Sequence, residues 1–168
     1  MSEEIVNKIA QSGLITLDPA DFIPREKIMV FDLKDFLFMG MILKEKDFRE
    51  ALKQYDWESL RDQTVTLTCT ADAIIPVWAY MLVTTCLSGI AKEVLMGNDL
   101  EARRQLFQRK LSELPAEPYR DQRVVIKGCG DELIEEFVYT ALTQKLVPVA
   151  KSVMYGEPCS TVPVYKRK

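Results

Sequence analysis

The sequence of 168 residues contains no histidine. This absence excludes the Ser-His and Cys-His pairs of many hydrolases, zinc sites with imidazole ligands and haem held by a histidine. The chain also has little excess charge, because 22 basic residues stand against 25 acidic ones and leave a net charge of −3. Nucleic-acid-binding domains carry a basic surface. We therefore expect no nucleic-acid partner.

Two kinds of short motif are missing as well. The first residues, MSEEIVNKIAQSG, have neither the basic start nor the apolar run of a secretory signal. We therefore expect a cytoplasmic protein, in which its four cysteines are free, reactive or metal-bound rather than paired in disulfides. Neither of the glycine-rich phosphate-binding motifs occurs, which disfavours nucleotide binding.

The sequence does contain an internal repeat. Residues 61–97 align without gaps on residues 120–156, and about a third of the 37 columns are identical. The two copies open with RDQTVTLTC and RDQRVVIKG and close at Gly97 and Gly156. Ordinary composition gives about two identities over such a length. The pattern therefore predicts that residues 61–97 and 120–156 are two copies of one structural unit.

Each copy is typical of a strand, a helix and a second strand. TVTLTC and RVVIKG are short, apolar and rich in β-branched residues, as a strand buried on both faces is. Two strands joined by a helix of this length form a parallel pair. We expect a single α/β domain with one mainly parallel sheet. Its parts are N-terminal strands and a helix in 1–60, repeat one in 61–97, a connecting helix in 98–119, and repeat two with a C-terminal strand in 120–168.

One stretch, from Ala73 to Ala91, has no charge over nineteen residues. A run of this length can cross a bilayer. The corresponding part of the second copy is charged, however, and Pro76 interrupts the run. We therefore expect no membrane span but a helix in the core or at a subunit contact, and its uncharged face predicts a homodimer.

Cysteines and carboxylates follow the predicted strands. In parallel sheets, ligands bind beyond the carboxyl ends of the strands. We expect three cysteines and three carboxylates to share that edge, while Cys86 is a small core residue. The candidate site residues are Cys69, Cys129 and Cys159 with Asp72, Asp131 and Glu157.

Thiols at such a place have two chemical uses. A thiol near a helix N-terminus ionises more easily and becomes a nucleophile or a metal ligand. Thiolates without imidazole suit zinc, copper(I) or iron–sulfur species, for which Cys69, Cys129, Cys159 and Glu157 are the candidate ligands. Asp72 and Asp131 have a simpler interpretation as helix caps. No closely spaced cysteine pair occurs, so the metal motif is weak.

Three segments, TADAIIPVWAYM, VVIKGC and YGEPCSTVPVYK, resemble the bacterial family known as domain of unknown function 2480. The likeness extends over nearly the whole chain and includes LKDFLFMGMILKEKDFREAL. It implies no catalytic residue, substrate or cofactor. It does imply an association with iron–sulfur assembly proteins as partners.

Three functions follow as alternatives. The first is an accessory factor of iron–sulfur or sulfur metabolism, in which Cys129 and Cys159, with or without Cys69, bind a metal or cluster or hold a persulfide. The second is a small-molecule enzyme with a nucleophilic cysteine and a nearby carboxylate. The third is a non-catalytic binding or scaffolding domain whose uncharged helix contacts a partner.

Overall fold

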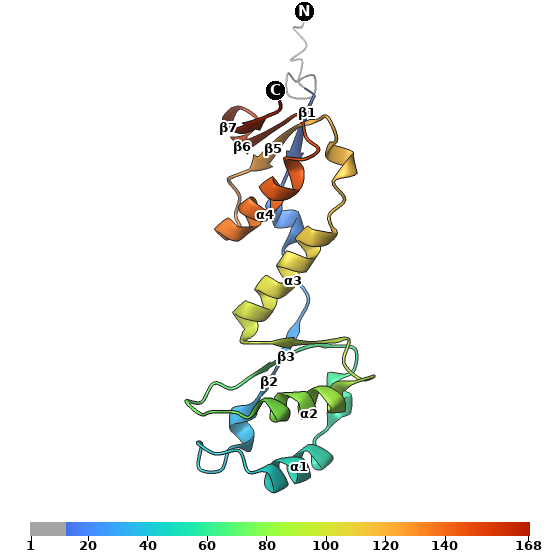
Figure 1. Cartoon of the computed structure of the whole chain (residues 1–168), viewed down its shortest axis with the longest axis vertical. Coiled ribbons are helices and arrows are strands. Elements are labelled where there is room, and N and C mark those ends of the chain that lie inside the picture. The colour runs from blue at the N-terminus through green and yellow to red at the C-terminus, as the bar shows by residue number, and fades with distance from the viewer. Residues whose placement is uncertain (1–12) are drawn as a thin grey trace, which may run out of the picture. The chain divides into compact units, whose positions relative to one another are not determined.

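Two β-sheets, each mainly parallel, organise this computed structural model, which describes residues 13–168 (Figure 1). One sheet has the strand order β2-β3-β4 and the other the order β1-β5-β6-β7. The chain divides accordingly. The inserted unit runs from Pro24 to Leu106, and the split unit consists of residues 13–23 and 107–168. The predicted α/β class with mainly parallel pairing is confirmed, but the strands form two sheets where the sequence predicts one.

The second sheet arises because each copy of the repeat has its own first strand. β2 (Ile28–Asp32) pairs in parallel with β3 (Thr64–Thr68) of the first copy. β1 (Leu14–Leu17) pairs in parallel with β5 (Arg123–Lys127) of the second copy. The four-residue strand β1 is too short to stand out in the sequence, so the separate sheet was not predicted.

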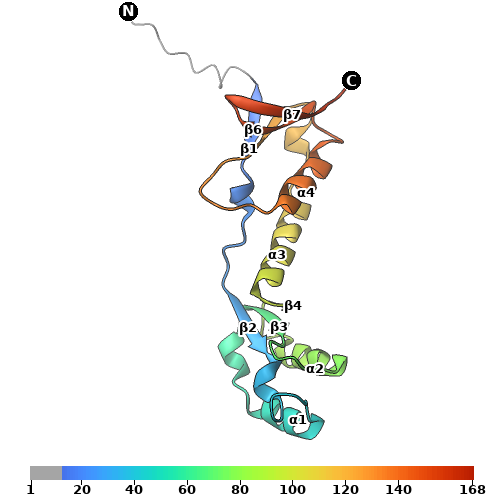
Figure 2. The ribbon, with the colours of Figure 1, turned by 90° about the vertical axis from the view of Figure 1, so that its left-hand side faces the viewer.

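The inserted unit packs α1 (Glu45–Gln54) and α2 (Val77–Leu87) on the same side of its sheet, which β4 (Glu93–Met96) completes (Figures 1 and 2). Side chains from both helices and from the strands form one core, in which Phe48 and Leu67 are among the largest fully buried residues. A smaller cluster of Ile28, Ala102 and Leu106 involves the first half of α3 (Asp99–Glu113).

The split unit repeats this plan. α4 (Glu136–Leu146) packs with Phe107 and Leu111, from the second half of α3, on Val124 and Ile126 of β5. β6 (Ser152–Glu157) lies parallel to β5, and β7 (Ser160–Lys166) pairs with β6 as an antiparallel hairpin (Figure 2). Four 3₁₀ helices lie among the described residues, η1 (Pro19–Phe22), η2 (Leu33–Phe36), η3 (Trp57–Leu60) and η4 (Glu117–Tyr119).

The elements recur at the spacing that the sequence predicts. β3, α2 and β4 begin at residues 64, 77 and 93, and β5, α4 and β6 begin at residues 123, 136 and 152, which is 59 residues later in each case. Unusual backbone recurs at the same spacing, with a positive φ of 57° at both Asp62 and Asp121. An origin of the two segments from one duplication stays a prediction.

The charge-free stretch is helical over less of its length than the sequence suggests. α2 covers Val77–Leu87 only, because Pro76 stands directly before it and Ser88 ends it. Among residues 13–168, no helix has the length and apolar character needed to cross a membrane. Val77 and Met81 are exposed on α2, as is Ile74 before it. The predicted homodimer stays a prediction.

Candidate functional site

The predicted site residues lie in two different units. Cys69 and Asp72 follow β3 in the inserted unit, whereas Cys129 and Asp131 follow β5 in the split unit. The prediction that they share one sheet edge is wrong, because β3 and β5 belong to separate sheets. Within residues 13–168, no three cysteine or carboxylate side chains are grouped in a way that would hold a metal ion.

Glu157 and Cys159 lie at the hairpin between β6 and β7. Glu157 is the last residue of β6, and its Oε1 atom is buried without a hydrogen-bond partner in the described part of the chain. Cys159 lies in the turn between the strands and is exposed. The predicted parallel pairing of β5 and β6 is confirmed, so Glu157 does reach the same sheet edge as Lys127.

Asp72 and Asp131 are not helix caps. The residues at the N-cap positions of α2 and α4 are Pro76 and Glu135, and neither helix has a side-chain cap. A segment with bends at 71–72 or 131–132 separates each strand from its helix. In the first copy, Pro76 disfavours helical backbone at the residue before it. Both aspartates therefore lie in loops.

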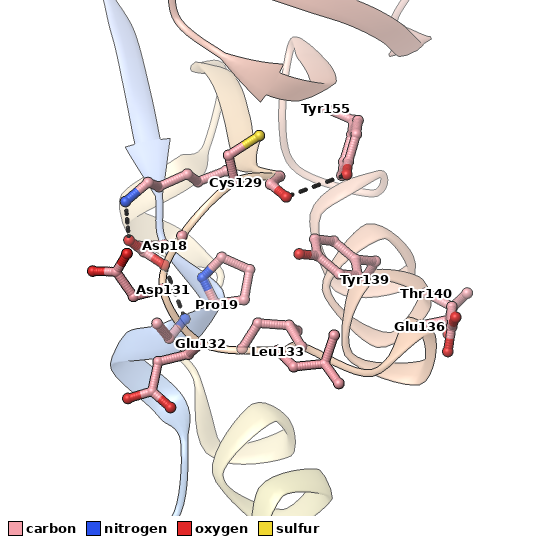
Figure 3. Close-up of a pocket in the computed structure, with 15 residues that line it drawn as sticks. Asp18, Pro19, Cys129, Asp131, Glu132, Leu133, Glu136, Tyr139, Thr140 and Tyr155 are labelled. Carbon is pink, nitrogen blue, oxygen red and sulfur yellow. Dashed lines mark hydrogen bonds and ion pairs between the residues drawn. The ribbon is translucent and has the colours of Figure 1, made fainter.

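A pocket of about 790 Å³ opens at the carboxyl end of β5 in the split unit (Figure 3). Its walls come from the β1–η1 junction, the loop after β5, the first turns of α4 and the end of β6. Ligand sites of parallel sheets occupy this position. The lining residues used below are Asp18, Lys127, Cys129, Gly130, Asp131, Glu132, Glu136, Tyr139 and Tyr155.

An ion pair lies in the pocket wall. The Nζ atom of Lys127 is 2.8 Å from Oδ2 of Asp18, and the two side chains are 33% and 30% exposed. The hydrogen bond and charge of Asp18, with the charges of Glu157 and Asp131, raise the pKa of Lys127. The hydrogen bond from Lys127, followed by one from Ala20, lowers the pKa of Asp18. Lys127 is therefore a cation at neutral pH and is not a nucleophile.

Two tyrosines form an aromatic part of the wall. The rings of Tyr139 on α4 and Tyr155 on β6 meet edge to face, with centroids 5.6 Å apart. Figure 3 shows them across the pocket from the loop that carries Cys129. The Tyr155 hydroxyl donates to the carbonyl oxygen of Gly128 at 3.4 Å. Burial, and then the charges of Tyr155, Asp18 and Cys129, raise the pKa of Tyr139.

At the equivalent place of the inserted unit, hydrogen bonds join the end of β2 to the loop after β3. Leu14 and Ile28 occupy the same register against their partner strands. Asp18, directly after β1, and Asp32, the last residue of β2, therefore lie at matching positions. Oδ1 of Asp32 accepts from the Thr70 amide at 3.1 Å, and its Oδ2 accepts from the Thr70 hydroxyl at 2.6 Å. We call this pair of bonds the Asp32–Thr70 latch. Only 10% of the Asp32 side chain is exposed.

The split unit has no such latch. Cys129 stands at the position equivalent to Thr70, and a thiol is a much weaker hydrogen-bond donor than a hydroxyl. The equivalent of Thr68 is Lys127, which takes Asp18 as its partner. The loop after β5 is therefore not tied to the end of β1 by the bonds that close the inserted unit.

The four thiols differ in environment. Cys129 is exposed and lines the pocket. Cys159 is exposed outside the lining, and the Cys69 thiol donates to the Ala71 carbonyl oxygen at 3.7 Å. Cys86 is half-buried against the inserted core, as predicted for a small core residue, and burial raises the pKa of its thiol. Cys129 is the thiol placed to meet a ligand in the pocket.

Sequence reasoning missed Asp18, Lys127 and the two tyrosines. A signal for Asp18 was present, because LDPADF at 17–22 and FDLKDF at 31–36 match at both aspartates and at the final phenylalanine. These segments are 14 residues apart instead of 59. The likeness between the two units therefore extends to segments before residue 61, which contain β1 and β2 or directly follow them.

Fold and pocket together define an α/β protein with two similar parallel-sheet units, of which the split unit carries a pocket at the carboxyl end of β5. The chain belongs to the family described as protein of unknown function (DUF2480), whose model matches residues 3–167. The resemblance noted in the sequence is thereby confirmed. No curated protein and no solved structure matches the chain.

Proposed function

We propose that the protein binds a small molecule in the pocket of the split unit, next to the thiol of Cys129. The observation that carries the proposal is the difference between two equivalent places in one chain. At one of them, Thr70 donates two hydrogen bonds to Asp32, whereas at the other Asp18 and Cys129 line the pocket and no hydrogen bond between them is found among residues 13–168. If this sheet edge had only a structural role, we would expect the second copy to keep the stabilising hydrogen bonds of the Asp32–Thr70 latch.

The content of the pocket supports binding as well. A ligand there meets a cation and an anion held in a 2.8 Å ion pair, two aromatic rings and a thiol. A few polar groups beside apolar and aromatic surface are typical of small-molecule sites. The volume of about 790 Å³ lies within the range of such sites.

The sulfur-related role that the sequence suggests takes a narrower form in this proposal. The lining contains one cysteine, and a single thiol suits a persulfide or a covalent adduct rather than a cluster, which takes several thiolates. In the persulfide case, the Cys129 thiolate attacks the outer sulfur of a persulfide donor. The new S–S bond forms on Cys129 as the donor's S–S bond breaks, and the donor leaves as its thiolate.

Mass spectrometry of the full chain, purified gently and away from oxygen, tests the proposal. We expect native spectra to show a bound small molecule, and spectra after denaturation to show whether part of it stays on Cys129. Gly130→Trp should abolish the bound species. Nothing lies within 4 Å of the Cβ that this substitution adds, so the larger side chain meets no clash at its Cβ, and we expect it to fill part of the pocket that residue 130 lines.

The matched control is Ala71→Trp, at the equivalent position of the inserted unit. We expect it to keep the bound species, because the proposed ligand lies in the other unit. If wild-type protein carries no small molecule and gains none from a small-molecule extract of its host cells, the proposal is wrong. Equal loss in both variants also contradicts it.

A further inference from the structure

The exposed residues of α2 and of its two ends are all uncharged. We call them the α2 face, and they are Ile74, Val77, Met81, Thr84, Thr85 and Ser88. Ile74 is 94% exposed, and Val77 and Met81 are 73% and 64% exposed. A surface helix normally carries charged or polar residues on the side that faces water. The first half of the α2 face therefore suits contact with another protein surface better than contact with water.

The fold itself does not require an apolar outer side at this place. α4 occupies the equivalent position in the split unit, and both helices bury three apolar residues at the same spacing in the cores of their units. Where α2 exposes Val77 and Met81, α4 exposes Glu136 and Thr140. The two helices pack alike and differ on their outer sides, which indicates an additional contact for α2.

The threonines of the α2 face can lose their contact with water at little cost. The Thr84 hydroxyl donates to the Tyr80 carbonyl oxygen at 2.8 Å, and the Thr85 hydroxyl donates to the Leu82 carbonyl oxygen at 2.7 Å. Burial of a hydroxyl costs free energy chiefly when its hydrogen bond is left unmade. Because both donors are paired within the helix, a partner can cover them without supplying acceptors.

A turn of the same unit adds to this surface. Phe38, Met39, Met41 and Ile42, between η2 and α1, are between 47% and 75% exposed. The turn lies on the same side of the unit as the loop before α2 (Figures 1 and 2). With about 100 Å² for a fully exposed apolar side chain, the turn and the α2 face present on the order of 500 Å² of apolar surface. A standard interface takes about 800 Å² from each partner, somewhat more than half of it apolar. The available area is therefore what a stable contact between proteins needs.

The absence of charge favours a second copy of this chain as the partner. In a dimer with two-fold symmetry, residues near the axis lie close to the same residues of the other copy. A charge there would meet a charge of its own sign, which is unfavourable, and the α2 face avoids this. Contacts between different proteins have no such restriction and commonly match opposite charges.

We propose that two copies of the chain bind each other through their α2 faces, with the two helices antiparallel across a two-fold axis. The face has its larger side chains up to Met81 and its smaller ones from Thr84 onward. In an antiparallel pair, Met81 of one copy therefore packs beside Thr85 of the other, and Val77 packs beside Ser88. Large side chains facing small ones allow close packing. The proposal concerns the inserted unit and is independent of the ligand pocket.

Sedimentation velocity of the full chain over a range of concentrations tests the dimer. We expect wild type to be dimeric at micromolar concentration. Met81→Glu and Thr85→Lys each place an unpaired charge at two points of the interface. Each should therefore raise the dissociation constant of the dimer about a hundredfold. Both positions are exposed, and circular dichroism should show that both variants remain folded.

A mixture of the two variants tests the antiparallel arrangement. In the mixed dimer, the introduced carboxylate at position 81 lies beside the introduced ammonium group at position 85, and the wild-type contact remains at the symmetric point. The mixture should therefore regain the dimer that each variant loses alone. Thr140→Glu makes a matched replacement at the position of α4 equivalent to Met81, and it should leave the dimer unchanged.

Three results would overturn the proposal. A wild-type chain that is monomeric at every concentration would leave the α2 face to a different protein. A wild-type dimer that neither Met81→Glu nor Thr85→Lys weakens would have its interface elsewhere. If both variants are monomeric and their mixture is monomeric as well, the antiparallel two-fold pairing is wrong.

Discussion

Asp32→Ala is expected to lower the free energy of unfolding of the inserted unit by about 3 kcal/mol, the upper range for hydrogen bonds to a charged group. The carboxylate accepts from the amide and hydroxyl of Thr70 and from the Lys34 amide at 3.0 Å. Because its side chain is only 10% exposed, water does not replace these bonds fully. The substitution leaves the amides of Lys34 and Thr70 and the Thr70 hydroxyl without this acceptor.

Tryptophan fluorescence during denaturation in urea measures this effect selectively. Both tryptophans of the chain, Trp57 and Trp78, belong to the inserted unit. The control is Asp18→Ala at the matching position of the split unit, where the ion pair is about one-third exposed. It should leave the tryptophan transition in place. A transition unchanged by Asp32→Ala would show that the latch does not stabilise the inserted unit.

The same comparison has a defined dependence on pH. Burial raises the pKa of the Asp32 carboxyl, but hydrogen bonds from Thr70 and Lys34 outweigh it and hold the pKa below the ordinary value of 3.8. A lowered carboxyl pKa contributes stability that is complete above the ordinary value and is lost as the pH falls through the folded-state pKa. The difference between wild type and Asp32→Ala should therefore narrow below pH 3.8.

Cys129→Thr is expected to lower the occupancy of the pocket by its ligand about tenfold. Threonine places at residue 129 the hydroxyl that Thr70 uses to close the inserted unit, with Asp18 as its acceptor. If the hydrogen bond from the threonine at position 129 to Asp18 contributes about 1.4 kcal/mol, roughly nine of ten molecules have a closed pocket. Only the remaining tenth can bind, so the apparent affinity is about tenfold lower.

Native mass spectra of the variant measure the occupancy. Cys159→Thr makes the same replacement at an exposed cysteine outside the pocket lining, and it should bind like wild type. Full occupancy in Cys129→Thr would mean that the identity of residue 129 does not control the opening of the pocket. The proposed origin of the open site would then be wrong.

The repeat made much of the fold predictable. Its β-branched runs become β3 and β5, and its spacing carries over to α2 and α4. The separation into two sheets was not predictable in the same way, because β1 and β2 lie 14 residues apart and pair with strands far along the chain. Local periodicity carries no information about which distant strand a short segment joins.

The site was predicted only in part. Placing Cys129 and Asp131 beyond a parallel strand was correct, since both line the pocket at the carboxyl end of β5. The prediction that Cys69 and Asp72 share this edge with Cys129 and Asp131 was wrong. It required β3 and β5 to lie in one sheet, and they lie in two. Lys127 was overlooked because a lysine at the end of a strand resembles any solvated charge until its partner, Asp18, is known to lie 2.8 Å away.

Hydrogen exchange at two equivalent amides tests most directly whether one unit is latched and the other open. The amide of Thr70 donates to Asp32, whereas the amide of Cys129 has no hydrogen-bond acceptor among residues 13–168. We predict strong protection of the Thr70 amide and rapid exchange of the Cys129 amide in the wild-type chain, measured residue by residue by NMR. Equal protection of both amides would contradict the account, because the two sheet edges would then be closed alike.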